Sequence, residues 1–226
     1  RNGQGEPVPD KEIFARLISE IRDRTDMIVC ATTSGRRYQS FEDRIRVLEL
    51  SGREKPDMAS LTLGSMNFTE GPYVNSPETI RRLAKEMQER GIKPELEVFD
   101  TGMLNYANYL RRKEVIDGSV PYFNFILGSL GAMPARRKDL VHLLTLVPDE
   151  AVWSAGGIGR YHFQVQKNAI ELGGSVRVGL EDTLYMSEDK EEYATNEKLV
   201  RRVVRYAQEQ GREIASPDQA REILNL

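Results

Sequence analysis

Short apolar segments alternate with amphipathic ones along this chain, and the alternation predicts a repeated strand–helix unit. Apolar and β-branched residues gather as in strands at 27–33, 58–64, 96–100, 122–128, 151–156 and 175–180. Helical periodicity is found near 10–23, 40–52, 76–90, 102–115, 136–147, 160–172, 195–209 and 217–225. Strands separated by helices indicate βαβ units and a parallel sheet.

The number and order of these segments favour a barrel. A closed (β/α) barrel needs eight strands, whereas six are predicted here, and a helix precedes the first of them. We therefore expect an α/β fold of the TIM (β/α)8 type, a single domain over residues 1–226, whose first two strands are missing from this chain. The alternative is an open doubly wound sheet of six strands, complete as it stands.

Four of the predicted strands carry one apolar and one polar face, because neighbouring side chains of a strand point in opposite directions. The polar faces hold Ser60, Thr62 and Gly64, then Glu95 and Glu97, then Asn124 and Gly128, and finally Arg177 and Glu181. If the apolar faces lie under helices, the polar faces converge on a charge-lined pocket. An antiparallel sheet with one wet face is the alternative, which the regular intervening helices disfavour.

The last strand of the pattern is the most informative. Arg177 and Glu181 share a face opposite Val176 and Val178, and an extended chain would place Arg177 two pleats deeper than Glu181. Buried charges need a partner or a chemical task, and barrel enzymes place their chemistry where strands end. A purely structural ion pair is the alternative interpretation.

Composition narrows the functional class. The net charge of −3 argues against a nucleic-acid partner, and no apolar run approaches the ~18 residues of a membrane span. We therefore expect no nucleic-acid partner, no membrane partner and a cytoplasmic location. The single cysteine, Cys30, excludes an internal disulfide and is predicted to be buried and unreactive within an apolar run.

Two further features carry weaker predictions. The glycine-rich segment at 156–160 precedes a helix, where backbone N–H groups can hold an anion, although a plain tight turn explains it equally well. His142 and His162 lie in helical segments and are predicted to be surface or packing residues rather than metal ligands.

Six segments spread over the chain together resemble the β-keto acid cleavage enzyme family. They are TTSG at 32–35, ASL at 59–61, GSMNF at 64–68, PELEVFD at 94–100, GGIGR at 156–160 and RVGLED at 177–182. The resemblance implies a TIM barrel and an acyltransferase of the retro-Claisen type. Such an enzyme condenses a β-keto acid with acetyl-CoA and releases acetoacetate and a new acyl-CoA.

The resemblance also implies roles for individual residues. Arg177 and Asp182 match the catalytic pair of the family, and Glu181 matches the glutamate that binds a divalent metal, usually zinc. A His-x-His pair completes that metal site, and Arg1 matches the arginine that closes the pair, which would place both histidines before residue 1. The substrate-pocket positions matched are Thr33, Ser34, Ser60 and Glu97, of which Glu97 would face a substrate ammonium.

The resemblance finally implies small-molecule partners only and a homo-oligomer, a tetramer in this family. Two other functional classes remain open from the residues alone. One is a different metal-dependent barrel aldolase or lyase, and the other is a non-catalytic, truncated barrel.

Overall fold

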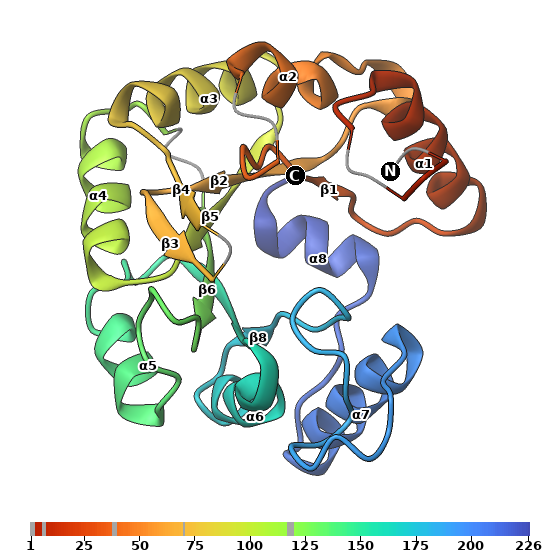
Figure 1. Cartoon of the computed structure of the whole chain (residues 1–226), viewed down its shortest axis with the longest axis vertical. Coiled ribbons are helices and arrows are strands. Elements are labelled where there is room, and N and C mark those ends of the chain that lie inside the picture. The colour runs from red at the N-terminus through yellow and green to blue at the C-terminus, as the bar shows by residue number, and fades with distance from the viewer. Residues whose placement is uncertain (1–2, 6–7, 38–39, 70, 117–119) are drawn as a thin grey trace.

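A curled, fully parallel sheet of six strands organises the protein (Figure 1). The structure is a computed structural model that describes residues 3–5, 8–37, 40–69, 71–116 and 120–226. The strands are β1 (Cys30–Ala31), β2 (Met58–Thr62), β5 (Lys93–Val98), β6 (Tyr122–Leu127), β7 (Val152–Gly157) and β8 (Ser175–Val176). They pair in the order β1-β2-β5-β6-β7-β8, which follows the chain. A doubly wound sheet reverses its order at a switch point, so this sheet is instead a half-barrel.

Helices alternate with the strands and cover the convex side of the sheet, except for the last helix, which lies inside its arc (Figure 1). They are α1 (Lys11–Arg24), α2 (Phe41–Ile45), α3 (Pro77–Glu89), α4 (Thr101–Arg112), α5 (Arg137–Leu144), α6 (His162–Glu171), α7 (Asn196–Glu209) and α8 (Pro217–Leu224), with 3-10 turns η1 (Arg46–Glu49), η2 (Gly52–Glu54) and η3 (Gly159–Tyr161). Local chemistry sets their ends. The Ser76 side chain caps α3 ahead of Pro77, and Gly91 follows the helix at a φ of 58°.

The core lies between the apolar face of the sheet and these helices. Leu61, Leu96, Phe123 and Phe125 are each 0 % exposed and belong to one apolar cluster with residues of the covering helices. The alternation of side chains therefore places the apolar face as predicted, and the polar face is left on the concave side.

The expected barrel is confirmed only in part. Within the described residues, β1 pairs with β2 alone and β8 with β7 alone, so the sheet is curled but not closed. Cys30 lies on the outermost strand β1 and is exposed, so the prediction of a buried cysteine is wrong. An edge strand lacks the neighbour that would cover it.

Two local differences from the predicted elements affect the site. The last strand ends at Val176 rather than near residue 180, and a turn closed by Asp182 N–H on the Gly179 carbonyl at 3.2 Å follows. An antiparallel hairpin of β3 (Met66–Phe68) and β4 (Gly71–Tyr73) follows β2, in a segment for which the sequence pattern predicted no strand. Among the described helices, none is long and apolar enough to cross a membrane.

Candidate active site

The polar face of the sheet opens into a cavity of about 420 Å³ beyond the C-terminal ends of the strands. Six of the seven residues to which the family resemblance gives a role line this cavity: Ser34, Ser60, Glu97, Arg177, Glu181 and Asp182. Thr62 and Gly128, from the predicted polar strand faces, line it too. The predicted convergence of the polar strand faces is therefore confirmed.

Arg177 holds Asp182 by two hydrogen bonds. Its Nε donates to Asp182 Oδ2 at 2.9 Å and its Nη2 donates to Oδ1 at 3.1 Å, while the Asp182 side chain is only 3 % exposed. Burial by itself would lower the pKa of Arg177, but its hydrogen bonds to Asp182 and the nearby carboxylates raise it above its ordinary value. A bidentate pair of this kind fixes both the charge and the orientation of the carboxylate.

Glycines of the segment 156–160 make room for this pair. A Cβ on Gly156 would lie 2.8 Å from the Arg177 Cβ, so the stem of Arg177 needs a glycine there. Gly159, at a φ of 60°, donates its N–H to the carbonyl of Asp182 at 2.7 Å. The glycine-rich segment is thus a tight turn whose N–H groups at 158, 159 and 161 bind the protein's own carbonyls.

Glu97 and Glu95 lie on the same face of β5, one above the other in the half-barrel. Glu97 accepts a hydrogen bond from Thr62 Oγ1 at 2.5 Å and lies 3.9 Å from Arg177 Nη1. Burial, and secondarily the charge of Glu95, raise the pKa of Glu97 to about 7. Burial also raises the pKa of Glu95, although Arg177 and the Asn124 amide, which donates to it at 2.9 Å, oppose that shift. The two carboxyls form a pair that holds a proton near neutral pH.

Hydrogen bonds fix the hydroxyl-rich segment that follows β1. Thr33 donates its hydroxyl to the Ser60 carbonyl at 2.6 Å and its N–H to Ser60 Oγ at 3.1 Å. The buried Arg44 donates to the Thr33 carbonyl at 2.7 Å. Both hydrogen-bonding groups of Thr33 are therefore used within the fold, and its neighbours Thr32 and Ser34 are the residues that line the cavity.

Three polar residues that sequence reasoning missed support the pocket from behind. Arg44 lies 3.5 Å from the Tyr73 hydroxyl, which donates to Thr62 Oγ1 at 3.3 Å. Asn75 donates its side-chain N–H to the Thr62 carbonyl at 3.0 Å. This relay connects the hairpin to Glu97, but its members are far apart in sequence and no local pattern marks them.

The described residues do not by themselves form a metal site. No group of three or more His, Cys, Asp or Glu side chains in the described chain is arranged to hold a metal ion. Glu181, the matched ligand, has an 85 % exposed side chain that accepts a hydrogen bond from Arg177 Nη2 at 3.0 Å. It offers one carboxylate at the rim, which falls short of the three protein ligands of a catalytic zinc site.

The two histidines lie outside the cavity. His142 is exposed on α5. His162 is buried at the start of α6, where burial, then the charges of Arg202 and Arg177, lower its pKa to about 4. It is therefore neutral at physiological pH, as befits a packing residue.

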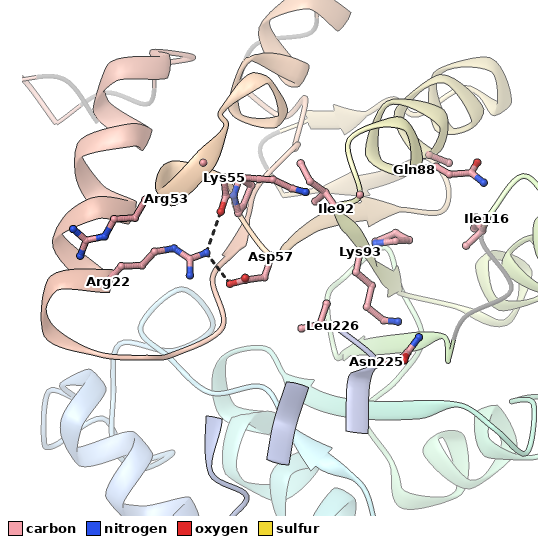
Figure 2. Close-up of a pocket in the computed structure, with 15 residues that line it drawn as sticks. Arg22, Arg53, Lys55, Asp57, Gln88, Ile92, Lys93, Ile116, Asn225 and Leu226 are labelled. Carbon is pink, nitrogen blue, oxygen red and sulfur yellow. Dashed lines mark hydrogen bonds and ion pairs between the residues drawn. The ribbon is translucent and has the colours of Figure 1, made fainter. Parts of the chain in front are cut away.

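A different cavity, of about 520 Å³, opens at the N-terminal ends of β2 and β5 (Figure 2). Arg22 donates there to the Lys55 carbonyl and to Asp57 Oδ2, both at 3.0 Å, and Asp57 also accepts from the Val29 N–H at 2.8 Å. These contacts fasten α1 to the sheet. Barrel enzymes place chemistry at the opposite end, so we assign this cavity a structural role.

This half-barrel with a polar cavity beyond its strand ends is typical of an α/β enzyme, and the comparisons with known proteins name the class. The model of the beta-keto acid cleavage enzyme family matches residues 1–226. The chain belongs to this family.

Curated relatives agree with the family. The 3-keto-5-aminohexanoate cleavage enzyme of Fusobacterium nucleatum is 42 % identical over 100 % of this chain and 81 % of its own length. The enzyme of that name from Acetoanaerobium sticklandii is 37 % identical, with the same coverage. The 3-oxoadipate:acetyl-CoA acetyltransferase of Cupriavidus necator is 36 % identical over 100 % of this chain and 78 % of its own length.

Solved structures support the fold. The apo structure of ObcA superposes with a TM-score of 0.80 at 18 % identity, over 96 % of this chain. The chain spans 55 % of the length of that protein. At this identity, the likeness bears on the fold alone.

Proposed function

We propose that the protein condenses a β-keto acid with acetyl-CoA and releases acetoacetate and a new acyl-CoA. The observation that carries the proposal is the contact of Arg177 with both carboxylate oxygens of Asp182 at the wall of a polar cavity. The chain that contains this pair belongs to the β-keto acid cleavage enzyme family. The curated relatives named for acetyl-CoA transfer support it.

Asp182 is the proposed general base. It would take a proton from C2 of the β-keto acid, and the resulting carbanion would attack the acetyl-CoA carbonyl, forming a C–C bond and expelling the CoA thiolate. The thiolate would then add to the original keto carbon. Cleavage of the bond between C2 and that carbon yields the new thioester, and the acetoacetate carbanion recovers the proton from Asp182. Arg177 holds the Asp182 carboxyl group in a fixed orientation through its two hydrogen bonds.

Glu97 is the proposed determinant of a cationic substrate. Its carboxyl lies on the cavity wall beside Arg177, and no cation other than Arg177 forms an ion pair with it in the described part of the chain. A substrate ammonium would supply the charge that favours its ionised form. We therefore favour an amino-substituted β-keto acid, in keeping with the relatives named 3-keto-5-aminohexanoate cleavage enzyme. Ser34 and Ser60 would bind polar oxygens of the substrate, with Thr33 holding their segment in place.

Three parts of the proposal reach beyond the described residues. Zinc, or another divalent metal, would use Glu181 as one ligand, with the remaining ligands supplied from outside the described chain. Two further strands would pair with β1 and β8 and close an eight-stranded barrel. The active form would be a homo-oligomer, a tetramer as in the family.

A substrate panel tests the proposal. The purified full-length protein would be incubated with acetyl-CoA and, in turn, 3-keto-5-aminohexanoate, 3-oxoadipate, 3-dehydrocarnitine and 3,5-dioxohexanoate, which are the compounds that relatives' names carry. We expect acetoacetate with at least one of them, most rapidly with the first, and none without acetyl-CoA. Absence of acetoacetate from the entire panel would refute the proposed activity.

A further inference from the structure

Another cavity, of about 630 Å³, adjoins the active site on the side of the last two strands. Residues 158–167, which follow β7, form one wall, and residues 180–190, which follow β8, form the other. It shares Ile158, Glu181 and Asp182 with the active-site cavity, so a ligand can extend from one into the other. We call it the side cavity.

Four cations line the side cavity, and none of them forms an ion pair with a carboxylate of the described chain. They are Arg160, Lys167, Lys190 and Arg202. Each instead lies over an aromatic ring, at distances between 4.2 and 5.8 Å from the ring centre. Elsewhere, partly buried cations such as Arg22 and Arg177 are matched by carboxylates. Three acidic residues line the side cavity: Glu181, Asp182 and Glu188. The first two contact Arg177, and Glu188 is exposed.

Arg202 is the least compensated of the four. Its Nη1 donates to the Met186 carbonyl and its Nη2 lies 3.4 Å from His162 Nδ1, while its Nε is buried with no hydrogen-bond partner. Burial lowers the pKa of Arg202, and its own charge contributes to the neutral state of His162. A partly buried guanidinium served by a carbonyl and a neutral imidazole favours an anionic ligand.

Apolar and aromatic groups accompany these charges. Phe163 and Tyr185 line the side cavity, as do Leu180, which is 37 % exposed, and Leu184, which is 59 % exposed. The lining therefore combines positive charge with surfaces on which a flat or apolar group can rest. Barrel enzymes often bind phosphate between the loops that follow their last two strands, which is where this cavity lies.

We infer that the side cavity binds the phosphate-bearing nucleotide end of CoA, so that the thioester end reaches past Ile158 to Asp182. This inference rests on the proposed function, because acetyl-CoA is the co-substrate there. Lys167 and Lys190, on opposite walls, hold the phosphates together with Arg202, which also contacts the Met186 carbonyl on the wall of residues 180–190.

Charge reversal tests the assignment. Lys167→Glu and Lys190→Glu should each raise the KM for acetyl-CoA about tenfold, the loss expected for one charge-assisted contact. The KM for acetyl-pantetheine, which lacks the nucleotide, should stay within about twofold, and so should the KM for the β-keto acid. Lys138→Glu, at an exposed site on α5 that does not line the cavity, is the matched control and should leave all three values unchanged.

The outcomes separate this inference from the proposed function. An unchanged KM for acetyl-CoA in both variants, or an equal rise for acetyl-pantetheine, overturns the inference while turnover persists. If the wild-type protein turns over no β-keto acid, titration calorimetry with adenosine 3′,5′-bisphosphate tests whether the side cavity binds the nucleotide end of CoA. Binding that both variants weaken supports the site. The absence of binding, or equal competition by inorganic phosphate, overturns it.

Discussion

Arg177 lies between two carboxyl groups and binds them unequally. It donates to both oxygens of Asp182, at 2.9 and 3.1 Å, but approaches Glu97 only to 3.9 Å. Asp182 is therefore held in a fixed orientation, whereas burial and the charge of Glu95 raise the pKa of Glu97 to about 7. This asymmetry gives the two groups different tasks, proton transfer at Asp182 and recognition at Glu97.

Replacing Arg177 separates charge from geometry. Arg177→Lys keeps the charge but loses the planar fork, so we expect kcat to fall by ~10²-fold or more with little loss of thermal stability. Arg177→Met leaves Asp182 buried and unpaired and should destabilise the fold by about 3–5 kcal/mol. Steady-state kinetics and urea denaturation measure the two effects. Near-wild-type turnover in Arg177→Lys would show that the positive charge alone suffices for catalysis. Near-wild-type turnover in Arg177→Met would show that the Arg177–Asp182 pair is only structural.

Glu97 should give the KM of an amino-substituted substrate a characteristic pH dependence. Its carboxyl must be ionised to bind an ammonium, so the KM for 3-keto-5-aminohexanoate should fall as pH rises through about 7. Glu97→Gln should raise that KM by about 10-fold or more and abolish the pH dependence. The KM for 3-oxoadipate, which lacks an ammonium, serves as the control. Equal effects on both substrates would remove Glu97 from cation recognition.

The same residue links stability to pH. Its folded pKa of about 7 lies above the ordinary value of 4.5, so the folded state binds the proton more tightly than the unfolded state. The contribution of Glu97 to the free energy of unfolding is therefore greatest below pH 4.5 and falls, by roughly 1–3 kcal/mol, as pH rises to 7.

Glu97→Gln should remove that part of the fall, so its stability relative to wild type should rise between pH 5 and pH 8. Urea denaturation at both values measures the difference, with the exposed Glu213→Gln as the control. A constant difference between wild type and Glu97→Gln at the two values would contradict the raised pKa.

Glu181 and Asp182 should respond differently in the intact protein. Glu181→Ala removes the carboxylate proposed as a metal ligand, so zinc content should drop to a small fraction of the wild-type value. Asp182→Asn should retain zinc but lose turnover, because an amide cannot accept the proton. Elemental analysis of both proteins, alongside kinetics, provides the measurement. Full zinc occupancy in the Glu181 variant would refute the ligand assignment.

Alternation along strands made much of this site predictable. The inward direction of Ser60, Thr62, Glu95, Glu97 and Asn124 depends only on the period of two, and the structure places all of them on the concave side. The parallel direction of the strands followed from the helices between them, whereas the sequential strand order, which separates a half-barrel from the doubly wound alternative, came from the structure.

The remainder depends on contacts that a local pattern does not encode. The last strand was expected to continue through residue 180, with Arg177 two pleats deeper than Glu181. The strand ends at Val176, and the turn from Gly179 to Asp182 brings Arg177 to 3.0 Å from Glu181 and onto Asp182. The supporting bond between Arg44 and Thr33 likewise joins segments that only the fold brings together.

The path of the acetyl group tests the central claim most directly. Acetyl-CoA labelled with ¹³C at the acetyl carbonyl would be incubated with the full-length protein and the best β-keto acid of the panel, and the products followed by NMR. The account predicts label at C3 of acetoacetate, with unlabelled C1 and C2 from the substrate and one acyl-CoA formed per acetoacetate. Unlabelled acetoacetate, or label in the new thioester, would contradict it.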